Sequence, residues 1–172
     1  MWKVLGMACI MTGCIGFAAV RTKEERYRIF HLREMIRIIR RIQDEMGYGK
    51  RTVPEICALL MEIAASPYDN CFGEIYQQMD RQRGMEIGTL WKEKVEACLQ
   101  NAGLSEDEKS ILSRLPESLG IQDERLQAAG IGQSIDRLER SLQEAEVSYG
   151  NRSRMIYSVS TLVGIFIVIL LL

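Results

Sequence analysis

The chain has 172 residues, of which 47% are hydrophobic and 26% charged, and its formal net charge at pH 7 is −1. A domain without a basic excess is poorly suited to nucleic acid, so we expect no nucleic-acid partner. The five cysteines contain no Cys-x-x-Cys pair, which argues against a zinc site or a disulfide framework and predicts a reducing compartment.

The first predicted element is an uncharged run at residues 4–20, preceded by Trp2 and Lys3. Such a run beside a tryptophan is typical of a transmembrane helix, so residues 1–21 are expected to form an N-terminal membrane anchor. Small residues recur on one of its faces and would let another membrane helix approach closely. The glycines on this face are Gly6, Gly13 and Gly16.

Two other interpretations of this segment are a cleaved signal peptide with a small-x-small site around Phe17, and a lipoprotein signal ending at Cys14. The apolar run continues past both positions without a polar break. Its basic flank, which includes Arg21 and Lys23, lies downstream of the run. By the positive-inside bias, the residues that follow stay in the cytoplasm.

The middle of the chain, residues 22–152, predicts a cytoplasmic bundle of about six helices. The first covers residues 23–46, carries apolar side chains at steps of three and four residues, and is ended by Gly47 and Gly49. The second begins near Val53, with a proline in its first turn. No stretch alternates convincingly with a period of two, so the expected fold class is all-α.

The remaining helices of the bundle follow the same apolar pattern. A third is expected over residues 70–82 and a fourth over residues 90–99. Ser105 opens the next helix with a capping box, although Pro116 must kink or split it. The last helix is predicted over residues 122–149 and is weakened in its middle by two glycines.

Charge is distributed unevenly along this domain, with residues 21–51 mainly basic and residues 104–146 mainly acidic. If the first and last helices lie antiparallel, their opposite charges face each other and neutralise within the domain. The alternative is that the basic side chains form a docking stripe for an acidic partner or for anionic lipid. The arginines of this stripe are Arg33, Arg37, Arg40 and Arg41.

The last element, residues 156–172, is again uncharged and nearly as long as a bilayer core requires. With Arg152 and Arg154 before it, residues 153–172 are expected to form a C-terminal transmembrane helix that keeps the middle domain in the cytoplasm. Gly164 supplies a small residue for close packing, either with the first anchor or with a helix of another membrane protein.

No stretch of the sequence predicts catalysis. The single histidine, His31, lies between apolar neighbours and has no Asp or Cys at helical spacing, so we interpret it as a packed structural residue. Gly49 and Lys50 lack the earlier glycine and the following Ser or Thr of a phosphate-binding loop. We therefore expect a non-enzymatic protein with no catalytic residues, metal, cofactor or small-molecule substrate.

Two stretches carry a recognisable pattern: residues 45–55 (EMGYGKRTVPE), and residues 119–127 (LGIQDERLQ) followed by Leu138 and Glu139. The first resembles the Glu-Ile-x-Tyr-Gly…Leu-Pro-Glu-Ala motif of the stage III sporulation protein AB family. The second is similar to that family's Leu-Gly-x-x-Asp-x-x-x-Gln…Leu-Glu motif. The order of the elements also matches, with a glycine-rich first anchor, a helical domain and an abrupt hydrophobic end.

This resemblance implies a two-pass membrane protein of endospore-forming bacteria, located in the mother-cell membrane around the forespore. It would serve as a platform subunit of the secretion-like channel complex that joins the two cells. The family's helical domain is similar to the cytoplasmic domain of the type II secretion F platform protein, which implies docking of a secretion-type ATPase and contacts with other channel subunits. The alternative is a membrane-tethered helical adaptor or regulator unrelated to secretion.

Both motifs fall in turns expected far from the anchors, so the resemblance places partner-docking residues there. The alternative is structural: the tyrosine packs the turn, the glycine adopts a positive φ, and the aspartate caps the last helix. The residues concerned are Tyr48, Gly49, Asp123 and Gln127.

Overall fold

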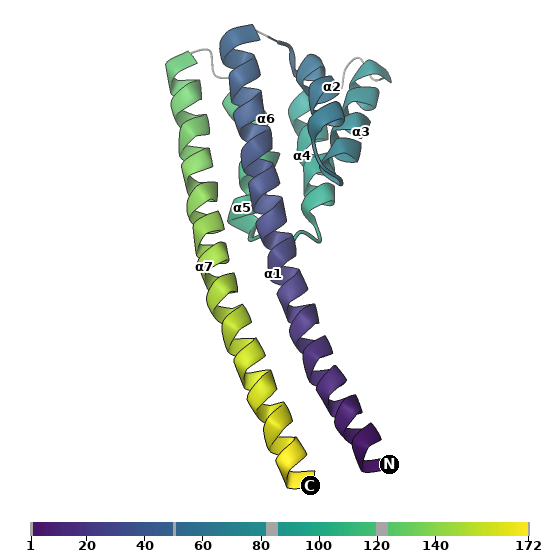
Figure 1. The fold of residues 1–172 in the computed structure, drawn as a ribbon. Coiled ribbons are helices and arrows are strands. Elements are labelled where there is room, and N and C mark those ends of the chain that lie inside the picture. Colours follow the sequence, from purple (N-terminus) through teal and green to yellow (C-terminus); the bar gives the residue numbers. More distant parts are fainter. Residues whose placement is uncertain (1, 50, 82–85, 120–123, 172) are drawn as a thin grey trace. The chain divides into compact units, whose positions relative to one another are not determined.

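The computed structural model of the chain describes residues 2–49, 51–81, 86–119 and 124–171 (Figure 1). These described residues form helices and no strand, which confirms the all-α fold class. The chain divides into two compact units. We call Met1–Ile29 together with Gln143–Leu172 the terminal unit, and Phe30–Leu142 the central unit.

Seven helices make up the described part of the chain. Where the sequence predicts an anchor and a separate domain helix at each end, the structure has one continuous helix. The first junction contains no Pro or Gly, and at the second junction α7 continues through Gly150, because a long helix propagates cooperatively past one weak position. The helices are α1 (Trp2–Gly49), α2 (Val53–Ile63), α3 (Tyr68–Arg81), α4 (Ile87–Leu99), α5 (Glu106–Ser113), α6 (Leu115–Leu119) and α7 (Glu124–Leu171).

The terminal unit joins the first part of α1 to the last part of α7. The Arg26 guanidinium donates a 2.5 Å hydrogen bond from Nε to the Tyr149 hydroxyl and lies 5.6 Å from the centre of that ring. Within the described part of the chain, no helix combines the length and hydropathy of a membrane span. Most side chains of residues 1–21 and 153–172, on which the anchor predictions fall, lie outside the described residues.

Side-chain caps set the helix starts in the central unit. At α2 the Glu55 carboxylate accepts hydrogen bonds from the backbone N–H and the hydroxyl of Thr52, at 2.8 and 3.0 Å, and Pro54 occupies the first turn. At α5 the Ser105 hydroxyl accepts from the backbone N–H of Glu108 at 3.2 Å, and the Glu108 carboxylate accepts from the N–H of Ser105 at 2.8 Å. This second arrangement is the capping box that the sequence predicts.

The segment around Pro116 is split and not merely kinked. Helix α5 ends at Ser113, and α6 begins at Leu115 with Pro116 in its first turn, where a missing N–H costs nothing. The separate α6 raises the number of helices from the expected six or so to seven. By contrast, α7 runs through Gly130 and Gly132 without a break, so the weak helix propensity of glycine is overridden there.

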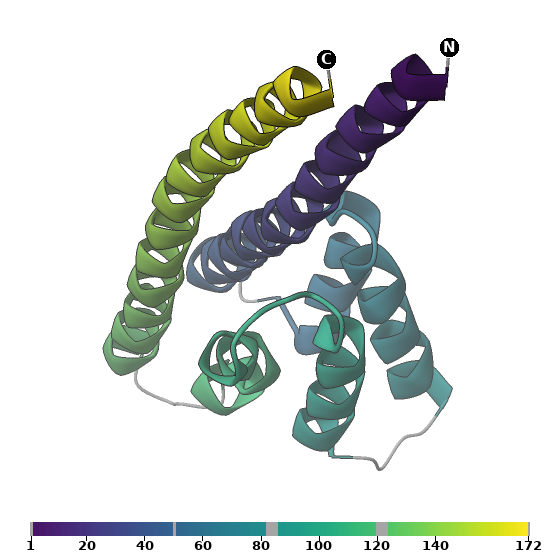
Figure 2. The same cartoon turned by 90° about the horizontal axis from the view of Figure 1, so that it is seen from below.

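The core of the central unit is built around Trp91 of α4, whose side chain is fully buried. Its ring packs against Phe72 of α3, with ring centroids 5.4 Å apart, and its Nε1–H donates a 2.8 Å hydrogen bond to the carbonyl oxygen of Leu112 in α5. One side chain therefore connects three helices. Figure 2 shows the short helices grouped beside the parts of α1 and α7 that belong to this unit.

Helix α1 turns its apolar face toward this core. His31 lies on the buried side, and its Nδ1 is 2.9 Å from the hydroxyl of Tyr68, which opens α3. Burial lowers the pKa of His31, because the imidazolium form loses its hydration. The histidine is thus packed, as predicted. The fully buried apolar residues of this face are Leu32, Met35, Ile39 and Ile42.

The three cysteines of the central unit are free thiols. Cys57 and Cys71 are buried, as expected for small apolar side chains, whereas Cys98 is only half-buried. Burial raises the pKa of Cys57 to about 12, so its thiolate does not form at neutral pH.

Candidate functional site: an arginine-lined groove

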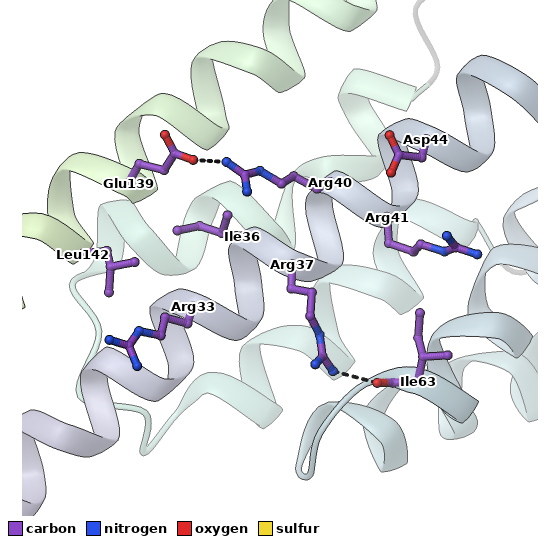
Figure 3. Close-up of a pocket in the computed structure, with 9 residues that line it drawn as sticks. All are labelled: Arg33, Ile36, Arg37, Arg40, Arg41, Asp44, Ile63, Glu139 and Leu142. Carbon is purple, nitrogen blue, oxygen red and sulfur yellow. Dashed lines mark hydrogen bonds and ion pairs between the residues drawn. The ribbon is translucent and has the colours of Figure 1, made fainter.

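An open groove of about 710 Å³ follows α1 in the central unit (Figure 3). Its lining combines four arginines, two carboxylates and three aliphatic side chains. They come from α1, from the last residue of α2 and from α7. The lining residues are Arg33, Arg37, Arg40, Arg41, Asp44, Glu139, Ile36, Ile63 and Leu142.

All four arginines of the predicted docking stripe line the groove, because their spacing along the sequence places them on one side of α1. Arg33, Arg37 and Arg40 recur at steps of four and three residues, which return to the same side of an α-helix. The fully buried residues, such as Leu32 and Ile39, fall on the other side. The pattern that buries one face of α1 therefore directs the guanidinium groups away from the core.

Arg37 and Glu34 attach the end of α2 to α1. Arg37 Nη2 donates to the carbonyl oxygen of Ile63 at 2.7 Å and to Glu34 Oε1 at 2.9 Å. The same Glu34 oxygen accepts a 2.7 Å hydrogen bond from the backbone N–H of Ala65. A carbonyl group that α2 leaves without a helical partner is thus satisfied, and Ile63 is fixed at the edge of the groove.

Arg40 reaches across the groove to α7, where its Nη2 contacts the Glu139 carboxylate (Figure 3). The Arg40–Glu139 pair is the kind of basic-to-acidic contact that the charge distribution predicts.

Glu45 connects the groove to the first sequence motif. Its Oε1 contacts Arg41 Nη2 at 2.7 Å and its Oε2 contacts Arg51 Nε at 3.0 Å. Because Glu45 opens the stretch 45–55, its two ion pairs connect Arg41 of the arginine stripe to Arg51 in the turn after α1. Neither Glu34 nor Glu45 was predicted as a site residue, although both stand three or four residues from an arginine of the stripe, which was a usable signal.

The Arg40–Glu139 pair contributes little to the fold, because both side chains are substantially exposed, at 57% and 43%, and such pairs contribute about 0.2–1 kcal/mol. The carboxylates of Glu34 and Glu45 are only 7% and 13% exposed, but their partners Arg37 and Arg41 remain 58% and 44% exposed, so the groove can bind anions. A guanidinium has five N–H donors, and the contacts of these three arginines within the described part of the chain go through Nη2. The arrangement suits bidentate recognition of carboxylates.

The other predicted docking residues lie at the end of α1 and the start of α7. Tyr48 and Gly49 close α1, and Gln127 is half-buried in the first turns of α7. Figure 1 draws both helix ends at the same end of the central unit. Asp123 and the side chain of Tyr48 lie outside the described residues, so the docking role of this set stays a prediction.

Most of the glycines predicted to pack membrane helices lie where the structure does not describe side chains. This applies to Gly6, Gly16 and Gly164. At Gly13, no heavy atom of the described residues lies within 4 Å of where a Cβ would be. Close packing at these glycines therefore remains a prediction.

Metal-ligating side chains do not gather in the described ranges: no group of three or more His, Cys, Asp or Glu residues is placed to hold an ion. Guanidinium donors of the groove stand next to exposed aliphatic surface, a combination suited to binding.

Comparison with known proteins identifies the family. A solved structure described as stage III sporulation protein AB has a similar fold, with a TM-score of 0.64, 22% sequence identity, and coverage of 72% of this chain and 97% of the other. A search of curated proteins returned no match. The sequence model of the stage III sporulation protein AB family matches residues 3–172, which confirms the resemblance of the two motifs. The chain therefore belongs to the stage III sporulation protein AB family.

Proposed function

We propose that this stage III sporulation protein is a non-enzymatic membrane platform subunit of a secretion-like channel complex between mother cell and forespore. In this role the central unit docks a cytoplasmic ATPase, and the two ends of the chain contact other membrane subunits. The observation that carries the proposal is the family match over residues 3–172, which includes the central unit and both apolar ends.

The arginine groove supports a docking role. It combines exposed guanidinium groups of α1 with aliphatic side chains from α2 and α7, and its Arg40–Glu139 pair is too exposed to contribute much to stability. Protein interfaces are enriched in arginine for the same reason, since one side chain supplies several directed donors.

The two apolar ends support membrane attachment. The runs at residues 4–20 and 156–172 are uncharged, and basic residues follow the first and precede the second. A domain held to one membrane at both ends has little freedom to swing. An ATPase that docks on it would then act against a fixed point.

The first test is recruitment of the ATPase. The full-length chain is tagged, isolated from membranes of sporulating cells, and assayed for co-purification of the secretion-type ATPase. We expect Tyr48→Ala and Asp123→Ala to lower recovery of the ATPase while the melting temperature stays within about 2 °C. The matched control is Gln133→Ala, at an exposed position of α7. If the unaltered chain recovers no ATPase, the platform role is wrong.

The second test is the orientation in the membrane. The native cysteines are replaced, one reporter cysteine is placed by Gly49→Cys, and intact cells are treated with a membrane-impermeant maleimide. Labelling only after permeabilisation agrees with a cytoplasmic central unit. Labelling of intact cells would mean an inverted or cleaved N-terminal segment, and ATPase docking would then be impossible.

The alternative function is a membrane-tethered adaptor that binds a soluble regulator through the arginine stripe. The exposed charge of the groove favours it as much as it favours docking of an ATPase. The two functions separate in the recruitment assay, because an adaptor of this kind would recover its regulator in cells that lack the ATPase.

A further inference from the structure

We propose that the groove binds an acidic, amphipathic helical segment of a partner protein, and that a carboxylate of this segment replaces Glu139 on Arg40. The inference rests on the proposed docking role and adds to it the chemistry of the partner. It also implies that Glu139 competes with the partner's carboxylate for the guanidinium of Arg40.

The charge pattern of α1 defines the occupant. Arg33, Arg37 and Arg40 present cations at steps of four and three residues along the groove. Carboxylates at the same steps on a helix face the same side of that helix. A helical segment with acids at matching positions, laid along α1, can therefore meet several guanidinium groups at once.

The aliphatic part of the lining requires the segment to be amphipathic. Ile63 is 42% exposed at the edge of the groove, and Leu142 lines the groove from α7. An exposed isoleucine held in place by the Arg37 contact to its carbonyl oxygen offers a fixed apolar surface. Burying it under a leucine or phenylalanine of the partner would add hydrophobic free energy to the ion pairs.

Glu139 already occupies part of this site. Its carboxylate contacts Arg40 Nη2, while both side chains remain substantially exposed, at 43% and 57%. An exposed pair of this kind is only weakly held, so a partner carboxylate can displace it at small cost. The displaced Glu139 side chain remains in water, where it needs no new partner.

The acids in the lining favour a peptide over a phospholipid headgroup. Asp44 and Glu139 lie among the arginines and would repel the fixed charge of a phosphodiester. A peptide can place a neutral or basic side chain opposite Asp44 and keep its carboxylates for the arginines. The mixture of positive and negative charges in the lining thus favours a peptide whose charges alternate to match it. A lipid surface of uniform negative charge has no such order.

The experiment measures binding of synthetic helical peptides to the full-length chain in mild detergent, by fluorescence anisotropy. The probe carries Glu at positions i, i+4 and i+7 with Leu on the adjacent face. One control peptide has Gln in place of each Glu, and vesicles with anionic lipid test the other occupant. We expect the Glu peptide to bind and its affinity to fall as salt concentration rises.

Variants of the chain then locate the site. We expect the double variant Arg33→Gln and Arg41→Gln to weaken binding roughly tenfold, and Glu139→Gln to strengthen it roughly threefold. The matched controls are the double variant Arg137→Gln with Arg140→Gln and the single variant Asp136→Asn, which remove the same charges at exposed positions of α7 outside the groove. We expect both controls to bind like the unaltered chain.

A charge-reversal variant distinguishes loss of the binding charges from misfolding of the chain. The variant Arg33→Glu with Arg40→Glu should lose the Glu peptide and gain a peptide with Lys at positions i and i+7 and Glu kept at i+4 opposite Arg37, and a misfolded chain would gain nothing. Equal binding of the Glu and Gln peptides, unchanged or weaker binding by Glu139→Gln, or groove-dependent binding of vesicles in preference to the peptide would overturn the inference. Because this assay contains no ATPase, its failure is distinct from failure of recruitment.

Discussion

The Glu34 carboxylate on α1 accepts a 2.7 Å hydrogen bond from the backbone N–H of Ala65, just beyond the end of α2. Its side chain is only 7% exposed, and it also contacts Arg37 at 2.9 Å. A single carboxylate thus fixes the loop after α2 and orients an arginine of the groove. Stability and binding are linked at this residue.

Replacement of Glu34 tests this link. Glu34→Ala should lower the free energy of unfolding by about 1–3 kcal/mol, because the N–H of Ala65 loses its acceptor in a partly buried place. Glu34→Gln should cost less, since its amide oxygen can still accept. Urea denaturation followed by circular dichroism measures both. Glu62→Ala, at an exposed position of α2, should change stability by less than about 0.5 kcal/mol, and an equal loss there would contradict the argument.

Trp91 should be among the residues most sensitive to substitution. Trp91→Phe removes the 2.8 Å hydrogen bond to Leu112 and leaves a cavity next to Phe72, so we expect a loss of about 2–4 kcal/mol in the free energy of unfolding. Tyr76→Phe, at an exposed aromatic of α3, is the matched control. A loss below about 1 kcal/mol for Trp91→Phe would mean that the core rearranges around the smaller ring.

The pH dependence of stability should carry the signature of His31. Because burial lowers the pKa of His31, the unfolded chain binds a proton that the folded chain does not, once the pH falls below the ordinary value of about 6.5. Stability should therefore decrease as the pH falls from about 6.5 toward the folded-state pKa, with no contribution from this residue above that window.

His31→Gln should flatten this part of the stability curve, measured as unfolding midpoints between neutral and mildly acidic pH. Tyr68→Phe provides the comparison, since it removes the hydroxyl partner but keeps the titrating imidazole. The chain has one histidine, so no other imidazole can mask the effect. An unchanged slope in His31→Gln would assign the acid sensitivity to carboxylates.

The central-unit thiols should react in a defined order. A hydrogen bond with Cys71 lowers the pKa of the half-buried Cys98, while burial holds the pKa of Cys57 at about 12. Alkylation with iodoacetamide near pH 8 should modify Cys98 first and Cys57 only after unfolding. Mass spectrometry of proteolytic peptides measures the order, and alkylation in urea sets the reference. Equal rates for Cys57 and Cys98 in the folded chain would contradict it.

Local signals made much of the fold predictable from the sequence. Pro54 marks the start of α2, the Ser105 box marks the start of α5, and Pro116 marks the break before α6, since each acts through neighbouring backbone groups. The continuity of α1 and α7 into the predicted anchors was harder to predict. Gly150 lowers the local propensity of α7 at the second junction, but a long helix gains cooperatively from the residues on both sides.

The candidate site was predictable in part. Arginines at steps of three and four residues indicated one helix face, and all four line the groove. The acidic character of the last helix predicted a contact of the Arg40–Glu139 kind, but not which residues meet. The contribution of Ile63 depends on how α2 lies beside α1. Such long-range packing leaves no signal at that position in a single sequence, and so the groove itself could not be predicted.

The division of the chain has a consequence for its biosynthesis. The terminal unit combines Met1–Ile29 with Gln143–Leu172, and the Arg26–Tyr149 contact joins residues 123 positions apart. The ribosome thus completes the central unit before the second half of the terminal unit emerges, after a delay of roughly 6–25 s at about 5–20 residues per second. An apolar first segment has no partner in its own chain during that interval. Its early fate depends on the insertion machinery or chaperone that receives the nascent chain.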